Sequence, residues 1–207
     1  MKQEDLLAIP VSQFIARTAA KTPTPGGGSV AGLVGALAAA LGEMSLNFTR
    51  GKKKYALHEE FYADLAQRLS GVQARFEQLI ADDIAAYEKY QAAAAMPEGQ
   101  AGKAAAQAQA LSAAIEVPRR AAAAALQLLE DLRAFGDKCN PYLISDLVAA
   151  ATLAVAALRM SDYNVRINTR QLADPSAAQQ LRQASAHEVQ RGAALRDEIE
   201  RLVSAHL

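Results

Sequence analysis

Three consecutive glycines, Gly26–Gly28, open an apolar segment and are flanked by Pro25 and Ser29. Glycines at a helix start expose backbone N–H groups that can approach an anion or a carbonyl closely, and the positive end of the helix dipole favours negative charge there. A purely structural use is to let a proline-rich lead-in turn into the helix. Glycine in a helix costs about 1 kcal/mol relative to alanine, however, and a single turn does not need three of them. We therefore predict a ligand-binding helix start formed by Pro25, Gly26, Gly27, Gly28 and Ser29.

The same glycines satisfy a loose dinucleotide-binding fingerprint, with Gly26, Gly28 and Ala31 at its spacing. That motif acts only between a strand and the helix of a βαβ unit, and no strand pattern precedes the glycines. The chain also lacks a Gly-Lys-Ser/Thr sequence. These observations exclude a Rossmann site and a P-loop.

A carboxylate falls on the apolar stripe of a long helical pattern. The stripe alternates steps of four and three residues through Leu65, Leu69, Val72, Phe76, Leu79, Asp83, Ala86 and Tyr90. A carboxylate on a buried face must be partnered or neutral. Two interpretations of Asp83 follow, a structural aspartate bonded to a neighbouring helix and an acid–base group of tuned pKa that faces a cleft.

A basic cluster, Lys52–Lys54 followed by Tyr55, lies just beyond the glycine-started segment. Such a cluster is usually solvated and complements the negative end of the helix dipole. Toward a ligand that carries carboxylates it becomes an anchor. Lys52, Lys53 and Tyr55 are therefore candidate binding residues.

Two polar groups frame a later segment rich in small residues. Ser145 and Asp146 make a favourable helix start, and capping explains Ser145 adequately. Asn164 and Asn168 are four residues apart, share a helix face and could pair with amide edges of a ligand. All four are candidate binding residues.

Other reactive side chains are sparse. His58, His187 and His206 have no metal-ligand spacing among themselves, and Cys139 is the only cysteine. We expect neither a metal site nor thiol catalysis.

The elements that position these residues are helices. Apolar residues make up 51% of the chain but aromatic residues only 5%, so the apolar share is carried by alanine, the strongest helix former. Apolar spacings of three and four recur throughout, without sustained period-two alternation. We predict an all-α fold with a single domain over residues 1–207, an up-and-down bundle of long helices. Two helices rich in small residues also indicate a dimer.

Six helices are expected, at residues 10–20, 26–49, 56–95, 100–134, 147–160 and 175–206. The second carries small residues at every fourth position, which let another helix approach closely, so we expect it to be central. Pro118 removes a backbone donor from the fourth and is expected to kink it. Asp174 and Pro175 are typical of the N-cap and first residue of the sixth.

Charge and hydropathy limit the partners. The 22 basic residues balance 22 acidic ones, so no bulk field favours nucleic acid or an anionic membrane surface. The uncharged stretch 26–42 is mostly glycine and alanine and is followed by Glu43, which favours a buried helix over a membrane span. Residues 1–10 carry acids and a proline where a signal peptide has a basic start and an apolar run. We expect a cytoplasmic protein without nucleic-acid or membrane partners.

Five of these segments occur together in one known family, in its order and spacing and over nearly the whole chain. They are Thr22–Ala31, Gly51–Tyr55, Asp83 with Ala86 and Tyr87, Ser145–Asp146, and Asn164–Asn168. The chain resembles the helical cyclodeaminase and methenyltetrahydrofolate cyclohydrolase family, which also forms the C-terminal domain of formiminotransferase-cyclodeaminase. The resemblance implies an all-α homodimer that binds tetrahydrofolate derivatives and acts on a one-carbon bridge between two ring nitrogens.

The activity that the resemblance implies is hydrolysis of 5,10-methenyltetrahydrofolate to the 10-formyl form, with no cofactor beyond the tetrahydrofolate substrate. Asp83 would be the general base for water, or an anion beside the cationic bridge. The triglycine and Ser29 would hold the pterin, and Asp146, Asn164 and Asn168 would pair with polar edges. The lysines would meet the glutamate tail.

Two alternatives stay open. A formiminotetrahydrofolate cyclodeaminase would expel ammonia to form the methenyl bridge, which the absence of a fused formiminotransferase domain in this sequence disfavours. A catalytically silent helical dimer would bind folate, or only another helical protein. The chain departs from its relatives at Asp137, where they tend to have Asn, and at Leu147, where they tend to have Ala. These departures bear on substrate contacts and not on the fold.

Overall fold

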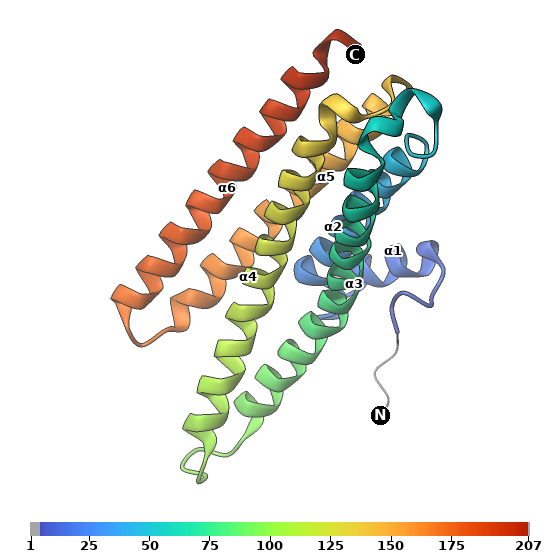
Figure 1. Cartoon of the computed structure of the whole chain (residues 1–207). Helices are drawn as coiled ribbons and strands as arrows, with labels where there is room; N and C mark the ends of the chain where they lie inside the picture. Colours follow the sequence, from blue (N-terminus) through green and yellow to red (C-terminus); the bar gives the residue numbers. More distant parts are fainter. Residues whose placement is uncertain (1–4, 207) are drawn as a thin grey trace.

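The computed structural model describes residues 5–206, and within that range the chain is helical and contains no strand (Figure 1). This confirms the all-α fold class. Residues 1–4 and 207, which the predicted domain includes, lie outside the described residues. The long helices are α1 (Val11–Ala19), α2 (Gly27–Asn47), α3 (Glu59–Ala95), α4 (Lys103–Phe135), α5 (Ile144–Asn168) and α6 (Pro175–Val203).

Four helices form the core of the bundle, because α2, α3, α4 and α5 each pack against the next and α5 packs back on α2. Helix α6 covers α4 and α5 from outside. Helix α1 lies across the bundle instead of along it (Figure 1), and only Phe14 of α1 is buried, against Ile80 and Ile84 of α3. The up-and-down description therefore fits the bundle without α1.

The predicted central position of α2 is confirmed by how closely α3 approaches it. A Cβ added at Gly35 would lie 2.3 Å from the Phe76 ring, and one at Gly32 would lie 2.7 Å from Ile80. Only glycine leaves room for these side chains against the α2 backbone. Phe76 is consequently fully buried in the core between the two helices.

Helix α2 begins partway along the bundle, beside Asp83 of α3. Residues 84–95 of α3 continue past that point for about 18 Å at 1.5 Å per residue. Alongside residues 84–95 of α3 the bundle therefore lacks α2, one of its four core helices. This leaves a cleft between α3, α4 and α5.

The fifth helix is longer than predicted at both ends, since it starts at Ile144 and continues to Asn168. The predicted end at Met160 is wrong because the polar residues that follow do not break the helix. Asn164 donates from Nδ2 to the Met160 carbonyl oxygen at 3.0 Å, a bond that keeps its side chain along the helix. At the start of α6, Asp174 accepts hydrogen bonds from the backbone N–H groups of Ser176 and Ala177, so this predicted N-cap is confirmed.

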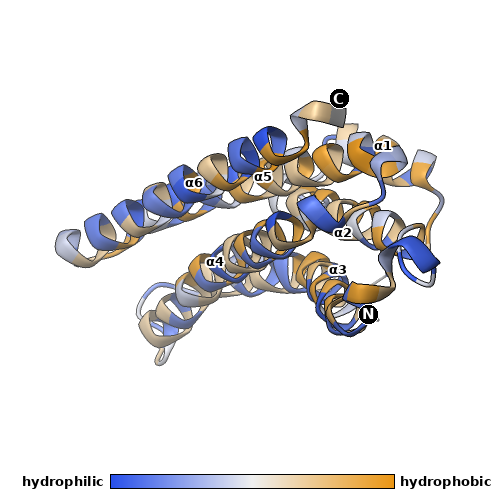
Figure 2. Ribbon diagram, turned by 45° about the horizontal axis from the view of Figure 1, so that its top comes forward, coloured by the Kyte–Doolittle hydropathy of each residue, from blue (hydrophilic) through white to orange (hydrophobic). Residues whose placement is uncertain are grey.

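By length and hydropathy alone, α2 and the segment Pro141–Gln171 would each suffice to cross a membrane. Core helices of soluble bundles have the same character, and both segments pack against several neighbouring helices. Figure 2 shows that hydrophobic residues predominate in α2 and α5, whereas α6, which lies outside the core, is more hydrophilic.

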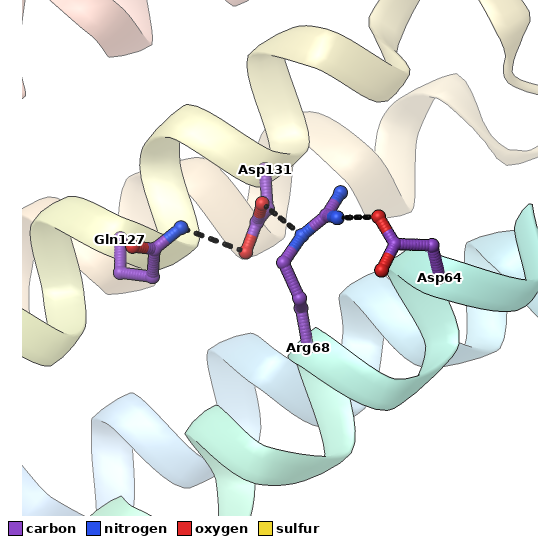
Figure 3. Close-up of polar contacts among 4 residues, drawn as sticks. All are labelled: Asp64, Arg68, Gln127 and Asp131. Carbon is purple, nitrogen blue, oxygen red and sulfur yellow. Dashed lines mark hydrogen bonds and ion pairs between the residues drawn. The ribbon is translucent and has the colours of Figure 1, made fainter. Parts of the chain in front are cut away.

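An ion pair between Arg68 and Asp131 joins α3 to α4 (Figure 3). Arg68 donates from Nε to Asp131 Oδ1 at 2.8 Å and also pairs with Asp64 one turn earlier. Gln127 donates to the other oxygen of Asp131 at 3.3 Å. The Asp131 side chain is 6% exposed and the Asp64 side chain is 63% exposed, so the two carboxylates depend on Arg68 to different degrees.

We expect Arg68→Ala to lower the free energy of unfolding by about 2 kcal/mol, because it leaves the buried Asp131 carboxylate without its charged donor. Asp64→Ala removes a solvent-exposed partner and should cost no more than about 0.5 kcal/mol. Urea denaturation of both variants measures the difference. Equal losses would show that the buried carboxylate is not what makes Arg68 important.

Candidate active site

The Asp83 carboxylate sits against the first turn of α2. The Ser29 hydroxyl donates a hydrogen bond to Asp83 Oδ2 at 2.8 Å, and the Ser29 backbone N–H donates to the same carboxyl group. A Cβ at Gly28 would lie 2.0 Å from Oδ1 and 2.5 Å from Cγ of Asp83. Position 28 must therefore be glycine for the carboxylate to reach Ser29.

Burial of the carboxyl group raises the pKa of Asp83 above its ordinary value of 3.8, and the two hydrogen bonds from Ser29 lower it by less. The neighbouring Asp82 instead forms an ion pair with Arg120 at 2.8 Å, away from the cleft. The prediction that Asp83 and not Asp82 occupies the inner stripe agrees with this geometry. Asp83 has the position and the raised pKa of a candidate general base.

The other residues of the predicted helix start have different surroundings. Pro25 is buried, Gly26 is the N-cap of α2, and an added Cβ at Gly27 would meet nothing within 4 Å. Gly28 and Ser29 therefore hold the Asp83 carboxylate. Gly27, one residue earlier, lies in the exposed first turn of α2. Gly28 thus makes room for a carboxylate of the protein itself, which the sequence alone did not indicate.

The cleft beside Asp83 contains a cavity of about 190 Å³. Helix α3 contributes Asp83, Ala86, Tyr87 and Tyr90 to its wall, and α4 contributes Leu111, Ala114 and Val117. Asn168 at the end of α5 and Gln171 in the short 3-10 helix after it complete the wall. A void of about 10 Å³ lies deeper, between Gly28, Asp83, Ser161 and Asn164. That void is about the size of one water molecule, and its mainly apolar lining includes the polar side chains of Asp83, Ser161 and Asn164.

Asn168 is held at the cleft by an interruption in α4. Pro118 has no backbone N–H, so the carbonyl of Ala114, four residues earlier, loses its helical donor. The Asn168 side chain supplies one instead and donates from Nδ2 to the Ala114 oxygen at 2.6 Å. Pro118, the predicted kink residue, thus frees the carbonyl oxygen through which Asn168 joins α5 to α4. This bond fixes one wall of the site.

Within one chain the structure brings Gly28, Ser29, Asp83, Asn164 and Asn168 together. Lys52, Lys53 and Tyr55 follow the far end of α2, which is about 30 Å long. Ser145 and Asp146 lie at the start of α5, near that same far end, where Asn140 bonds to Thr49. These five residues do not line the Asp83 cleft of their own chain, and their binding role stays a prediction.

Sequence reasoning missed the part of the cleft formed by Tyr87, Leu111 and Gln171. Tyr90 was on the predicted stripe of α3 but was not named as a site residue. Its hydroxyl donates to Gln171 Oε1 at 2.8 Å across 81 positions of sequence. The helical periodicity could indicate Tyr90, but nothing in the sequence pairs it with Gln171.

Among residues 5–206, no three histidine, cysteine, aspartate or glutamate side chains gather as a metal site would require. Cys139 is buried beside Thr49, and burial raises the pKa of its thiol to about 11. The thiolate form is therefore disfavoured at neutral pH.

Comparison with known proteins gives consistent results. Residues 10–187 match the family model described as formiminotransferase-cyclodeaminase. A methenyltetrahydrofolate cyclohydrolase from Methylorubrum extorquens is 32% identical over 174 residues, which cover 82% of this chain and 84% of that protein. The formimidoyltransferase-cyclodeaminase of Gallus gallus is 28% identical over 83% of this chain but only 33% of its own length. The chain thus spans about a third of that larger relative.

A solved structure supports the same relationship. The crystal structure of a formiminotetrahydrofolate cyclodeaminase from Thermotoga maritima superposes with a TM-score of 0.87 at 27% identity, and covers 96% of this chain and 98% of its own. The resemblance inferred from the five sequence segments is confirmed by these matches.

The coupling between Pro118 and Asn168 can be tested with a double-mutant cycle. Asn168→Ala should lower the free energy of unfolding by about 1 kcal/mol, because the Ala114 carbonyl loses its donor. In a Pro118→Ala background the helix regains its own N–H, so the same change should cost clearly less. Urea denaturation of the four proteins measures both steps. Additive effects would contradict the coupling.

Proposed function

Because the chain belongs to the formiminotransferase-cyclodeaminase family, we propose that it is a methenyltetrahydrofolate cyclohydrolase. The observation that carries the proposal is the 32% identity to a protein of that name over most of both chains. The proposed reaction hydrolyses 5,10-methenyltetrahydrofolate to 10-formyltetrahydrofolate. It requires a folate-binding cleft and a group that takes a proton from water, and the site beside Asp83 offers candidates for both.

The proposed reaction has two steps. Water attacks the amidinium carbon between N5 and N10 and loses a proton to the Asp83 carboxylate, which gives a neutral tetrahedral adduct. The C–N5 bond then breaks as Asp83 returns the proton to N5, and the remaining hydroxyl loses its proton to become the formyl carbonyl. The net products are 10-formyltetrahydrofolate and one proton. No cofactor beyond the tetrahydrofolate substrate takes part in this scheme.

The surroundings of Asp83 suit both steps. The Ser29 hydroxyl and backbone N–H orient the carboxylate, and the void between Asp83, Ser161 and Asn164 can hold one water. The cationic amidinium would lie against an anionic group in a partly water-excluded cleft, where the attraction is stronger than in bulk water. General acid–base catalysis of this kind contributes about 10²- to 10⁴-fold.

Formiminotetrahydrofolate cyclodeaminase is the second candidate function. The observation that favours it is the close structural match to a protein of that name. Its reaction also passes through a tetrahedral carbon between N5 and N10. Ammonia leaves this carbon, and no water attacks it. The same carboxylate can move the protons of either reaction, so the two candidates differ in substrate and not in site.

We also propose that the protein is a homodimer formed through α2 and α5. Both helices expose large apolar side chains, namely Leu37 on α2 with Phe48 directly after it, and Tyr163 and Ile167 on α5, each more than half exposed. Exposed apolar residues on adjacent helices are typical of protein interfaces. A second copy of the same face would cover them with isologous symmetry.

Such a dimer would bring candidate residues that lie far apart within one chain closer to one another. Leu37 is the midpoint of α2, so two antiparallel α2 helices crossing there place the end of one helix, at residue 47, beside the start of the other, at residue 27. The partner's Lys52 and Lys53 would then stand beside the lead-in to Gly28, at the edge of the Asp83 cleft. From there they would meet the carboxylates of a glutamate tail, as predicted for these residues, only if that tail folds back toward the start of α2.

The activity test follows the near-ultraviolet absorbance of 5,10-methenyltetrahydrofolate with wild type, Asp83→Asn and Asp82→Asn. We expect hydrolysis well above the buffer rate for wild type and Asp82→Asn, and a loss of 10²-fold or more in kcat for Asp83→Asn. Burial raises the pKa of Asp83 above 3.8, so Asp83 becomes protonated and no longer acts as a base when the pH falls below that raised pKa. The activity in the kcat/KM profile should therefore fall on the acid side at a pH above 3.8. No acceleration by wild type would sink the cyclohydrolase proposal. Turnover of the 5-formimino substrate alone would favour the cyclodeaminase.

The dimer proposal is tested with Leu37→Glu and with Leu202→Glu on α6 as a control, since the two leucines are 51% and 50% exposed. Sedimentation should show a wild-type dimer, a monomeric Leu37→Glu variant and a dimeric control. Asp83→Asn chains are mixed with Lys52→Ala/Lys53→Ala chains at a substrate concentration so low that each variant alone shows little activity. Mixing should restore up to a quarter of the wild-type activity, because one site in a mixed dimer is intact. A monomeric wild type, or no restoration after subunit exchange, contradicts the shared site.

A further inference from the structure

The cleft does not end at the cavity beside Asp83. A second cavity of about 590 Å³ continues from it toward the open end of the bundle. The two share Tyr90, Leu111 and Gln171 in their walls. The hydrogen bond from the Tyr90 hydroxyl to Gln171 Oε1 fixes two sides of the neck between them. The far cavity is thus a continuation of the candidate site.

Size argues that a folate-type substrate must extend past the Asp83 cavity. Its 190 Å³ is below the roughly 300–1,000 Å³ of typical small-molecule sites. It has room for a bicyclic ring system beside Asp83 but not for the aminobenzoyl group as well. The far cavity is the larger of the two and adjoins it directly.

The walls of the far cavity identify which part of a substrate fits. Its sides are alanines of α3 and α4 that face each other across the gap, Ala93, Ala94, Ala104 and Ala108. Methyl groups on two opposed helices leave a slot with apolar sides, which suits an aromatic ring. The polar side chains among the described lining residues include the carboxamides of Gln107 and Gln171, which can donate to and accept from an amide.

Charge excludes the glutamate tail from the same slot. None of the described residues that line the far cavity is lysine, arginine or histidine. A carboxylate there would lose water without gaining a cationic partner. The slot therefore suits the neutral aryl amide, and the charged tail must end outside it.

We propose that the far cavity is the subsite for the aminobenzoyl group of the substrate, with its ring between the alanines of α3 and α4 and its amide against Gln107 and Gln171. This inference rests on the proposed folate substrate. It makes the part of α3 and α4 beyond α2 a binding element and assigns the affinity for the aryl amide to residues of a single chain.

The test compares Ala94→Trp, which places an indole in the slot, with Ala92→Trp on the other face of α3. Both alanines are exposed, so neither change disturbs the core. Each variant is assayed with 5,10-methenyltetrahydrofolate and with a truncated cyclic amidine that carries a methyl group on N10 in place of aminobenzoylglutamate. Ala94→Trp should raise KM for the full substrate at least tenfold and leave kcat/KM for the truncated one within twofold. Ala92→Trp should leave both within twofold.

An unchanged KM for the full substrate in Ala94→Trp would overturn the inference, and so would an equal loss with both substrates. Ala108→Trp tests the facing wall if the first variant does not fold, as judged by its melting curve. If the wild type turns over neither substrate, the proposed function fails, and calorimetry with N-(4-aminobenzoyl)-L-glutamate then decides the cavity separately. Binding by wild type that Ala94→Trp abolishes would support the subsite, and no binding by wild type would overturn it.

Discussion

The carboxylate of Asp83 reaches Ser29 only because residue 28 has no side chain. A methyl group at that position would lie 2.0 Å from Oδ1, well inside van der Waals contact, so the Asp83 carboxyl group could not keep its place against α2. The contact sets where α2 begins relative to α3, and it brings an ionisable group to the positive end of a helix. Both the cleft and the electrostatics of the site follow from this one approach.

The cleft results from helices of unequal length. Helix α2 has 21 residues and α3 has 37, and their contact at Asp83 leaves the last third of α3 without α2 beside it. In that region α4 and the end of α5 are the remaining walls, joined by the Asn168 bond to the carbonyl that Pro118 leaves without a donor. A proline that would destabilise an isolated helix thus fixes the position of a neighbouring helix here.

Much of the fold was predictable because helical periodicity and end signals are local. The stripe through Leu79, Asp83 and Ala86 placed the carboxylate on the inner face, and Asp174 marked the start of the last helix. The end of the fifth helix was misplaced because Asn164 bonds within the helix instead of ending it. Motif order did not predict that the lysines lie far from Asp83 within one chain, at the opposite end of α2, a helix about 30 Å long. The far cavity depends on Gln171 meeting Tyr90, a contact between segments 81 residues apart.

Opposing effects on Asp83 suit it to a cationic substrate. Burial of the Asp83 carboxyl group outweighs the bonds from Ser29 and raises the pKa of Asp83, so the ionised form is held at some cost. An amidinium cation beside the carboxylate would favour the ionised form and lower that pKa, which strengthens binding of the charged substrate. In the proposed reaction, attack by water neutralises the cation as the carboxylate takes up the proton of that water, so the charge on Asp83 disappears together with the charge that stabilised it. A carboxylate in bulk water would gain little from either change, because solvent would screen the pair, whereas one held by Ser29 in a partly closed cleft couples its protonation to the charge of the substrate.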